Sequence, residues 1–567
     1  MKQSTVFLCT CYDEIDRVVD CEALRTRLLK DPRVASVTVD EALCREGRMT
    51  GLAESMNKHD ESVLVAACSP LARGDRLLQD LAKEGIPASR VQLVDLREGC
   101  SWIHANDGPE AEKKAVDLLE MGLISLHNKE ASADVTVKPA GRVLVIGAGP
   151  AGLAAAAALA RCGIAVTILE RGAEPGGTLG LISKIYPDDI TPAERLGPLR
   201  EAIEAHPDST LRPRANIVSV SGYAGNFRVR YTSGDREYKE TFGAVILATG
   251  GRIFLPKGHY RYGELKKVIT QMELEGRFKK NLVEGKKAVF IQCVGARCDE
   301  RPYCATTCCP ASIKNAMRII EEEEGQAWIL HRDIMTPGNV LESYYRRSMA
   351  MGVQFIRFSP EDPPKVKGID TVESVEVRDS ISGVTRTIPA DLVVLSTPLV
   401  AGVDTPVLAV HFGLQLDSYG FFREIYPLHP VETRIDGVFI CGSARWPVSS
   451  EQAALQGEAA AMKAVGLLAG KTLAASELSR VPGPKLGHAR ADNDSCSGCG
   501  NCAAVCPFDA IRLQRRRDGG TFRMVSRVNK FRCKACGSCL SVCPNGTMQI
   551  PEASTRSIFG MIEKAFS

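Results

Sequence analysis

The sequence predicts an α/β protein of three parts: a small N-terminal α/β domain, a dinucleotide-binding core, and a C-terminal domain rich in cysteine. Three observations support this prediction. Strand-like and helix-like segments alternate over residues 1–130, a strand–glycine–helix–strand pattern fills residues 142–170, and eight cysteines lie between Cys496 and Cys543. The 567 residues of the chain are enough for several domains, each with its own core.

The composition excludes some classes of function. Lys and Arg (71) nearly balance Asp and Glu (68), so the charge gives no argument for binding nucleic acid or an anionic membrane. Residues 1–11 show no secretory signal, and the most apolar window, residues 143–169, is interrupted by Arg161. We therefore expect a cytoplasmic chain with no transmembrane segment of its own. In such a chain, 21 cysteines indicate metal or redox chemistry rather than structural disulfides.

The N-terminal domain is predicted from four short apolar strands separated by helical stretches: Val6–Cys9, Val34–Val39, Val63–Ala67 and Val91–Val94. Four cysteines, Cys9, Cys44, Cys68 and Cys100, lie at or just beyond the carboxyl ends of strands or in the loops there. Because the loops at that edge of an open sheet converge, these thiols could hold one iron–sulfur cluster, with Cys11 as a substitute for Cys9. The alternative is that they are buried structural thiols, since cysteine is often a small core residue.

The core begins with the segment Arg142–Glu170, which reads RVLVIGAGPAGLAAAAALARCGIAVTILE. An apolar strand leads into Gly147-x-Gly149-x-x-Gly152, an alanine-rich helix follows, and a second strand ends at Glu170. In this order the glycines let the backbone approach a pyrophosphate at the helix N-terminus, and the carboxylate can hold a ribose hydroxyl. We predict a dinucleotide site here; a structural turn without a ligand is the alternative.

Two later segments resemble the two-dinucleotide-binding flavoproteins, whose core is like that of thioredoxin reductase. Ala244–Gly250 (AVILATG) is similar to the strand that returns to the flavin, and Gly437–Ala461 is similar to the closing strand and helix. Where that family usually has Gly-Asp, this chain has Gly442-Ser443. The resemblance implies FAD as the cofactor. The residues expected to contact it are Gly147, Gly149, Pro150, Ala151, Gly152, Glu170, Arg171, Gly177, Thr249, Gly250, Gly442 and Ser443.

The C-terminal domain contains two runs with the spacing C-x-x-C-x-x-C-x-x-x-C-P, which start at Cys496 and Cys533. This is the spacing of bacterial two-cluster ferredoxins, in which the fourth cysteine of each run serves the other cluster. Zinc sites prefer paired C-x-x-C units without the third cysteine, so structural zinc is the less favoured alternative. We assign one [4Fe–4S] cluster to Cys496, Cys499, Cys502 and Cys543, and the other to Cys533, Cys536, Cys539 and Cys506.

A second βαβ unit is expected over residues 287–332, at the position where the resembling flavoproteins bind NAD(P)H. Its first turn should carry glycines but reads CVGARCDERPYCATTCCP, from Cys293 to Pro310. Thiols replace the phosphate-binding glycines, so NAD(P)H is not expected to bind there. The thiols could bind an iron–sulfur cluster, form a redox disulfide such as Cys304–Cys308, or bind zinc. Soft ligands and the redox context favour a cluster, with Cys298 as the spare thiol.

The segment QCVGARCDERPYCATTCC resembles the characteristic cysteine segment of the heterodisulfide reductase A-subunits, a family of FAD- and iron–sulfur-containing flavoproteins. Residues 67–70, 97–104, 419–422 and 430–433 resemble other parts of that family, so the resemblance covers nearly the whole chain. It implies a cluster on Cys293, Cys304, Cys308 and Cys309. It also implies an oxidoreductase: the electron-transfer component of a multi-subunit complex, in which FAD splits electron pairs into single electrons that travel along [4Fe–4S] clusters.

The implied partners are other redox subunits, of the heterodisulfide-reductase B/C type or quinone-linked, with a homodimer inside the larger complex and membrane association through those subunits. Two departures from the family stand out. Leu181–Gly243 contains no cysteine, so an extra ferredoxin insertion is absent, and Pro447–Ser450 replaces a Pro-Lys-Asp-Ile run beside the flavin. Flavin-based bifurcation is therefore not carried over. The alternatives are a self-contained NAD(P)H:acceptor or disulfide oxidoreductase, or a scaffold with relic sites; no catalytic acid, base or nucleophile is evident.

These features predict the domain boundaries. A helix over Ser557–Phe566 is expected either to cover the ferredoxin domain or to contact a partner. The predicted divisions are an N-terminal domain (1–130), an FAD domain in two pieces (141–255 and 385–470), an NAD-domain-like insert (256–384), a linker (471–494), a ferredoxin domain (495–552) and a tail (553–567).

Overall fold

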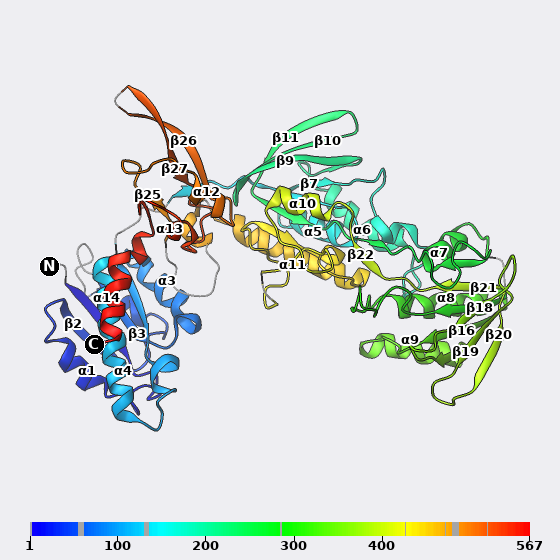
Figure 1. The fold of residues 1–567 in the computed structure, drawn as a ribbon, viewed down its shortest axis with the longest axis horizontal. Coiled ribbons are helices and arrows are strands. Elements are labelled where there is room, and N and C mark those ends of the chain that lie inside the picture. Colours follow the sequence, from blue (N-terminus) through cyan, green and yellow to red (C-terminus); the bar gives the residue numbers. More distant parts are fainter. Residues whose placement is uncertain are drawn as a thin grey trace. The chain divides into compact units, whose positions relative to one another are not determined.

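The computed structural model describes residues 3–54, 62–129, 135–283, 286–425, 427–470, 472–478, 487–518 and 520–567 (Figure 1). The chain divides into two compact units, one that combines residues 1–136 with 474–567 and one that holds residues 137–473. The N-terminal domain and the C-terminal domain therefore share one unit, although they lie at opposite ends of the sequence.

A four-stranded parallel sheet forms the N-terminal domain, in the order β2-β1-β3-β4. The predicted strands are confirmed as β1 (Ser4–Cys9), β2 (Val34–Asp40), β3 (Ser62–Ala67) and β4 (Val91–Asp95). Alternate residues of β1 enter different cores, as the period of a strand requires: Val6 and Leu8 enter one core, and Phe7 and Cys9 the other. The helices that contribute to these cores are α1 (Cys21–Leu28), α2 (Arg48–Glu54), α3 (Asp75–Lys83) and α4 (Gly108–Asn128).

The C-terminal domain is built from short elements around its cysteines. These are β25 (Arg490–Ala491), α12 (Asn501–Val505), α13 (Ser538–Ser541) and β28 (Met548–Gln549). A long antiparallel hairpin, β26 (Ile511–Asp518) and β27 (Thr521–Val528), projects from this domain (Figure 1).

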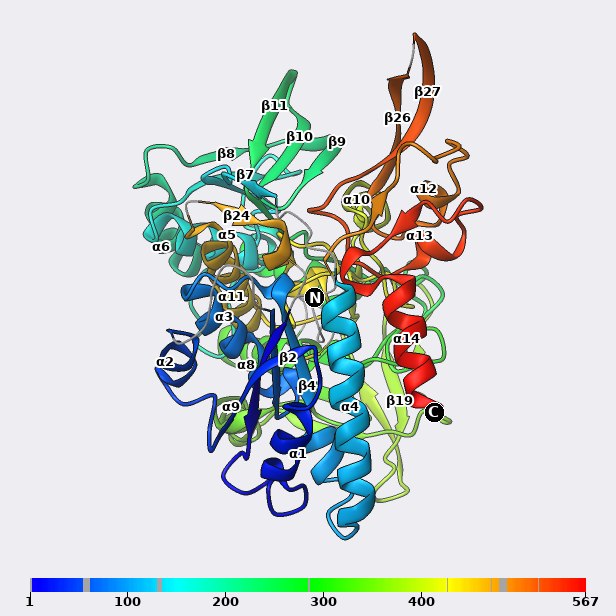
Figure 2. The ribbon, with the colours of Figure 1, turned by 90° about the vertical axis from the view of Figure 1, so that its left-hand side faces the viewer.

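The helix expected near the C-terminus is present as α14 (Thr555–Ala565), and its packing partner is α4 of the N-terminal domain (Figure 2). Lys564 Nζ lies 3.0 Å from Glu120 Oε2 and 3.2 Å from Asp117 Oδ1. Gly560 faces Ile124, where an added Cβ would lie 3.0 Å from the isoleucine side chain. The helix thus ties the end of the chain to its first domain, a contact that neither sequence-based interpretation included.

The predicted linker 471–494 differs from the structure at both described ends. β24 (Leu473–Ala474) pairs with β5 (Thr136–Val137), and β25 pairs with β28 of the C-terminal domain. The C-terminal domain therefore begins before residue 495. Two-residue strands carry too few side chains to give a periodic signal, so they depend on a partner that only the fold supplies. The middle of the predicted linker, residues 479–486, lies outside the described residues.

The second unit begins with a five-stranded parallel sheet, in the order β23-β12-β6-β7-β8. Its strands are β6 (Arg142–Ile146), β7 (Ala165–Leu169), β8 (Thr210–Arg212), β12 (Ala244–Leu247) and β23 (Val438–Ile440). α5 (Pro150–Arg161) packs closely on α11 (Ser450–Leu468), because Gly457 has no side chain to meet the backbone of Ala151. Buried all round, α5 is apolar, yet no helix within the described residues is long and apolar enough to cross a bilayer.

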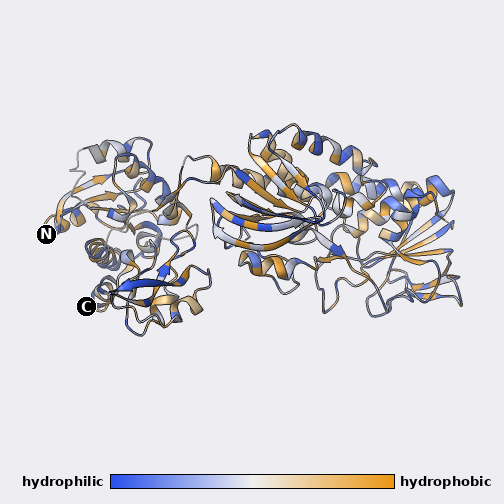
Figure 3. Cartoon of the chain, turned by 90° about the horizontal axis from the view of Figure 1, so that it is seen from above, coloured by the Kyte–Doolittle hydropathy of each residue, from blue (hydrophilic) through white to orange (hydrophobic). Residues whose placement is uncertain are grey.

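Smaller elements surround this sheet. A three-stranded antiparallel sheet is formed by β9 (Ala215–Tyr223), β10 (Asn226–Ser233) and β11 (Arg236–Phe242). The remaining elements are α6 (Pro192–Glu204), α10 (Thr405–Phe412), β13 (Gly251–Ile253) and β22 (Leu399–Ala401). Hydrophobic residues gather on the sheets and on inner helix faces (Figure 3).

The insert forms its own five-stranded parallel sheet, in the order β14-β21-β15-β16-β17. The strands are β14 (Val268–Thr270), β15 (Lys287–Ile291), β16 (Gln326–His331), β17 (Gln354–Arg357) and β21 (Leu392–Leu395). With it go α7 (Gln271–Lys279), α8 (Cys308–Glu323), α9 (Gly338–Ala350) and the antiparallel strands β18 (Lys365–Lys367), β19 (Ser374–Arg378) and β20 (Thr385–Pro389). Because β20 and β21 belong to these sheets, the insert continues beyond the predicted boundary at residue 384.

Candidate functional site

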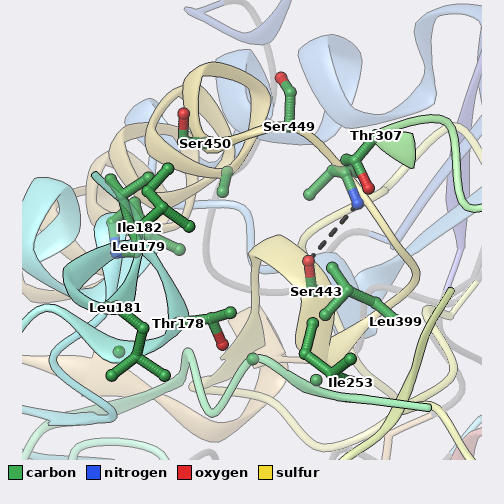
Figure 4. A pocket seen from close by; sticks show the side chains of 18 of the residues that line it. Thr178, Leu179, Leu181, Ile182, Ile253, Thr307, Leu399, Ser443, Ser449 and Ser450 are labelled. Carbon is green, nitrogen blue, oxygen red and sulfur yellow. Dashed lines mark hydrogen bonds between the residues drawn. The ribbon is translucent and has the colours of Figure 1, made fainter. Parts of the chain in front are cut away.

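A cavity of about 450 Å³ lies in the second unit, a size typical of small-molecule sites (Figure 4). Its wall is formed by the turn between β6 and α5, the segment after β12, and the starts of α8 and α11. These segments lie far apart in the sequence, and the two parallel sheets bring them together.

Two glycines are required by the backbone at the first of these turns. Gly147 has φ of +103°, and a Cβ there would lie 2.3 Å from the carbonyl oxygen of Ala248. A Cβ on Gly152 would lie 1.8 Å from the carbonyl oxygen of Gly147. A side chain on Gly147 would push the turn away from β12, and a side chain on Gly152 would push α5 away from the turn. The close approach of the backbone to the cavity therefore depends on glycine at these two positions.

Ten of the twelve residues expected to contact the cofactor line the cavity. They are Gly147, Gly149, Pro150, Ala151, Glu170, Arg171, Gly177, Thr249, Gly250 and Ser443. The other two, Gly152 and Gly442, lie behind this wall. A Cβ on Gly442 would lie 2.8 Å from the Cβ of Ala151, so this glycine lets the loop after β23 pack against α5.

The polar groups of the wall fit a dinucleotide such as FAD. The Glu170 carboxylate accepts hydrogen bonds from the backbone N–H of Ala148 at 2.8 Å and of Gly172 at 2.6 Å, which hold it at the end of β7. Each carboxylate oxygen keeps a lone pair for a ribose hydroxyl. Thr249 Oγ1 is buried and has no hydrogen-bond partner among the described residues, as expected of a group that meets a ligand.

The apolar part of the wall was not predicted from the sequence. Leu179, Leu181 and Ile182 line the cavity just after Gly177, an expected cofactor contact (Figure 4). The run GTLGLIS that contains them is apolar but too short to show a helical or strand period. An apolar run directly after an expected cofactor contact was the sequence signal that could have identified these residues as part of the site.

A buried ion pair in the wall was also missed. Lys314 on α8 donates to Glu275 on α7 and to the carbonyl oxygen of Lys184 at 2.7 Å, and the N–H and Oγ of Ser183 donate to Glu275 at 2.9 and 2.6 Å. Burial lowers the pKa of Lys314, although the carboxylate opposes the shift. Burial alone would raise the pKa of Glu275, but the ammonium group of Lys314 and the hydrogen bonds from Ser183 together outweigh it, and the net shift is downward.

The structure brings Cys293, Cys304, Cys308 and Cys309 together at the turn between β15 and α8. Burial raises the pKa of Cys309 to about 12, and the neighbouring Cys293 and Cys304 add to the rise. Burial, followed by the influence of the other three thiols, also raises the pKa of Cys308. Charge interactions between thiols fall off with distance, so these contributions require the four sulfurs to be neighbours. Cys298 lies in the connecting loop, where its backbone pairs with Arg301.

This thiol set adjoins the cavity directly. Thr307 and Cys308 belong to the cavity wall, and Cys308 Sγ lies 3.4 Å from the carbonyl oxygen of Thr397, another wall residue. A group held in the cavity and a cluster held by Cys308 would therefore be neighbours. Four soft thiolates are the ligands that iron–sulfur clusters prefer.

In the C-terminal domain, the fourth cysteine of each run lies beside the other run. Burial would raise the pKa of Cys496, but hydrogen bonds from the backbone of Ser526 and Gly498 outweigh it, and Cys543 is close enough to act on this thiol. Burial raises the pKa of Cys539 to about 12, with contributions from Cys533, Cys536 and Cys506. This arrangement is the one that the two-cluster spacing predicts.

Hydrogen bonds to sulfur are present in both sets. The backbone N–H of Ala510 donates to Cys506 Sγ and that of Ala489 to Cys533 Sγ, each at 3.3 Å. Ser526 Oγ lies 3.0 Å from Cys502 Sγ, and Thr547 Oγ1 lies 3.2 Å from Cys543 Sγ. Such hydrogen bonds stabilise thiolates and help set the reduction potential of a bound cluster.

In the N-terminal domain, three of the four predicted thiols gather and the fourth does not. Burial raises the pKa of Cys9 to about 11 and that of Cys68 to about 11, and the charges of the Cys11 and Cys44 thiols also act upward on both. Hydrogen bonds from the backbone of Leu43 and Cys11 oppose the rise at Cys9. Cys100 instead lies fully buried against α4, where its Sγ donates to the carbonyl oxygen of Ala111 at 3.2 Å.

The set that the structure assembles at this edge is therefore Cys9, Cys11, Cys44 and Cys68. The helical segment Arg97–Ser101 after β4 turns Cys100 into the core and leaves Arg97 at the edge, where its Nη1 donates to Cys11 Sγ at 3.0 Å. All 21 cysteines of the chain are free thiols. Among the described residues no three His, Cys, Asp or Glu side chains are placed to chelate a single metal ion, so the sets are neighbouring thiols rather than closed mononuclear sites.

Comparisons with known proteins match two parts of the chain to family models. A model described as pyridine nucleotide-disulphide oxidoreductase matches residues 141–292, and one described as a 4Fe-4S dicluster domain matches residues 495–547. The first match ends immediately before Cys293, the first cysteine of the turn between β15 and α8.

Whole-chain relatives were also found. The chain is 30% identical to the iron-sulfur A-subunit of CoB–CoM heterodisulfide reductase from Methanocaldococcus jannaschii, over 92% of each chain. It is 29% identical to the first of two corresponding A-subunits from Methanopyrus kandleri, over 90% of each chain. Among solved structures, T. acidophilum thioredoxin reductase matches with a TM-score of 0.42 and 19% identity, over 58% of this chain and 99% of that one.

Proposed function

The chain belongs to the family of heterodisulfide reductase A-subunits, and from this premise we propose how its sites divide the work of electron transfer. It is an oxidoreductase that joins a pyridine nucleotide-disulphide oxidoreductase core to a 4Fe–4S dicluster domain. The observation that carries the proposal is the position of Cys308, which belongs to the four-thiol set of the insert and also lines the cavity that fits FAD.

In this proposal the cavity holds FAD through the groups already described. Gly147 and Gly149 bring the backbone to the pyrophosphate, Glu170 takes a ribose hydroxyl, and Thr249 donates its unused hydroxyl. Leu179, Leu181 and Ile182 exclude water from the ring side. The bound flavin supplies exchange of electrons in pairs or singly, and [4Fe–4S] clusters supply single-electron transfer.

Four clusters are proposed. Two are held by the crossed runs of the C-terminal domain, one by Cys293, Cys304, Cys308 and Cys309, and one by Cys9, Cys11, Cys44 and Cys68. The last set replaces the sequence-based one, because Cys100 is committed to the core of the N-terminal domain. Cys309 is buried and the other three thiols of this set are half-buried, which limits solvent access, one of the means by which a protein sets cluster potential.

The alternative of a self-contained NAD(P)H oxidoreductase lacks support at the second βαβ unit. The turn after β15 presents Cys293 and the other thiols where a phosphate-binding glycine motif would be needed. Other subunits would then supply electrons and the terminal acceptor. The names of the relatives specify a CoB–CoM heterodisulfide for those proteins. For this chain we propose partner redox subunits and a homodimer within a cytoplasmic complex. The partner subunits would connect that complex to a membrane.

Iron, sulfide and flavin analysis of anaerobically purified protein tests the proposal. Four cubane clusters predict about 16 irons per chain, three predict about 12, and the dicluster domain alone predicts about 8. The variant Cys308→Ala/Cys309→Ala should lose about four irons and keep its FAD, whereas Cys298→Ala in the same loop should lose none. Unchanged iron in the double variant would refute a cluster beside the cavity, and bleaching of the flavin by NADH would favour the alternative.

A further inference from the structure

The hairpin β26–β27 carries a surface that none of the cofactor sites uses. It extends away from the rest of the C-terminal domain in both views (Figures 1 and 2). Between Ile511 and Val528 it holds six arginines and one aspartate. The pairing of the two strands divides these arginines between the two faces of the hairpin.

Directly opposed residues of an antiparallel pair lie on the same face, and the faces alternate along each strand. The register opposes Arg515 to Met524 and Arg517 to Phe522, and these four residues form what we call the open face. The other face carries Arg512, Arg516, Arg523 and Arg527.

The arginines of the other face have polar partners within the protein. Arg516 Nη1 lies 2.8 Å from Asp494 Oδ1, Arg512 Nη2 lies 3.3 Å from Asp509 Oδ2, and Arg523 Nε lies 3.1 Å from Asp518 Oδ2. Arg527 Nη1 donates to Gln514 at 3.0 Å. This face is therefore largely neutralised by the domain itself.

The open face differs in charge and in polarity. Within the described residues, neither Arg515 nor Arg517 has a carboxylate within 4.0 Å, and the guanidinium of Arg515 lies over the ring of Phe522, 4.9 Å from its centroid. Phe522 is 61% exposed and Met524 is 40% exposed. Arginine, aromatic and methionine side chains are the types enriched at protein–protein interfaces. The open face thus combines uncompensated positive charge with exposed apolar surface.

This face leads directly to a cysteine set. The next opposed pair on the same side of the hairpin is Leu513 and Ser526, and Ser526 Oγ lies 3.0 Å from Cys502 Sγ. A Cβ on Gly498 would lie 2.4 Å from the carbonyl oxygen of Met524, so β27 touches the loop of the first cysteines. Cys499 in that loop is exposed. A protein docked on the open face would lie next to the cluster assigned to Cys496, Cys499, Cys502 and Cys543.

We propose that the open face docks an acidic one-electron carrier protein, whose carboxylates pair with Arg515 and Arg517 and whose apolar centre covers Phe522 and Met524. The inference rests on the proposed function, since it takes the adjacent thiols to hold a [4Fe–4S] cluster. In the docked complex one electron passes between this cluster and the cofactor of the carrier. One of them is oxidised by losing the electron that reduces the other, no proton is transferred, and no bond forms or breaks. Complementary charge speeds encounter, and apolar contact slows dissociation.

The test compares two variants of the full chain that remove the same charge. Arg515→Gln/Arg517→Gln changes the open face. Arg512→Gln/Arg516→Gln changes the other face, where each of the two arginines pairs with a carboxylate. The probe is an acidic [2Fe–2S] ferredoxin, with a basic c-type cytochrome as the control of opposite charge. At 50 mM salt the open-face variant should bind the ferredoxin about tenfold more weakly and the control variant less than twofold more weakly, since uncompensated charges dominate steering. The difference should vanish at about 500 mM salt, where screening is strong.

The variant Phe522→Ser tests the apolar part separately. It should weaken ferredoxin binding at both salt concentrations, because apolar contact is not screened. Equal affinities of the two arginine variants, or stronger binding of the cytochrome than of the ferredoxin, would overturn the proposal. The proposal would also be overturned if a 20-base-pair DNA duplex outcompeted the ferredoxin and bound the open-face variant more weakly than the wild type. Binding is measured with all samples oxidised, so iron analysis and electron-transfer rates, which test the proposed function, can fail independently of docking.

Discussion

Replacement of Lys314 by methionine should destabilise the second unit, because it would leave the carboxylate of Glu275 buried without its cation. The two side chains are 2% and 4% exposed, so water cannot take the place of the lost ammonium group. Breaking a buried pair by removing one partner typically costs about 3–5 kcal/mol. Two hydrogen bonds from Ser183 would still reach the carboxylate, at 2.9 and 2.6 Å, which places the expected loss near the lower end, at about 3 kcal/mol.

The matched variants are Glu275→Gln and the double variant Lys314→Met/Glu275→Gln. Glu275→Gln leaves the ammonium group with the carbonyl oxygen of Lys184 and an amide, and should also cost about 3 kcal/mol. The double variant holds no buried charge, and its amide still accepts from Ser183. It should therefore lose at least about 2 kcal/mol less than the sum of the single variants, because residues in one network are not additive.

Urea unfolding at pH 7.5, followed by tryptophan fluorescence and flavin release, measures these free energies. Trp328 and Trp446 both belong to the second unit and report on it. A loss below about 1 kcal/mol for Lys314→Met, or additive single and double variants, would refute the reasoning that this pair is a coupled, buried ion pair.

Four further outcomes are expected. Gly152→Ala should abolish flavin binding, because its Cβ would lie 1.8 Å from a backbone oxygen; FAD content and thermal stability measure the effect, and retained FAD would contradict it. Cys11→Ala should lose about four irons and Cys100→Ala none, as iron analysis would show; the reverse result would restore the sequence-based set. Ser526→Ala should lower the reduction potential of one cluster at constant iron content, since a hydrogen bond to sulfur is removed; an unchanged redox titration would argue against that bond. Burial lowers the pKa of His331 to about 4, so between pH 6.5 and 5.5 this histidine binds a proton in the unfolded chain but not in the folded one. The free energy of unfolding should therefore fall by about 1 kcal/mol over this range in the wild type but not in His331→Gln. Urea unfolding at the two pH values measures the difference.

The sequence alone determined the features that depend on neighbours along the chain. The strand, glycines and helix of residues 142–170 predicted the β6–α5 turn, because each contact of that turn lies within one βαβ unit. The crossed cysteine runs of the C-terminal domain were predictable for the same reason, since tight loops of fixed spacing place the thiols. The four strands of the N-terminal domain were predicted because apolar residues there recur with the short period of a buried strand.

Only the tertiary structure decided which distant groups meet. Cys11 joins the N-terminal thiols and Cys100 does not, because the segment after β4 turns inward toward α4, and no local pattern encodes that turn. The pairing of Lys314 with Glu275 depends on how α7 and α8 pack. The packing of α14 on α4 likewise joins the two ends of the chain. Spacing along the sequence sets local geometry, whereas burial of one element against another selects among the many distant partners that a composition allows.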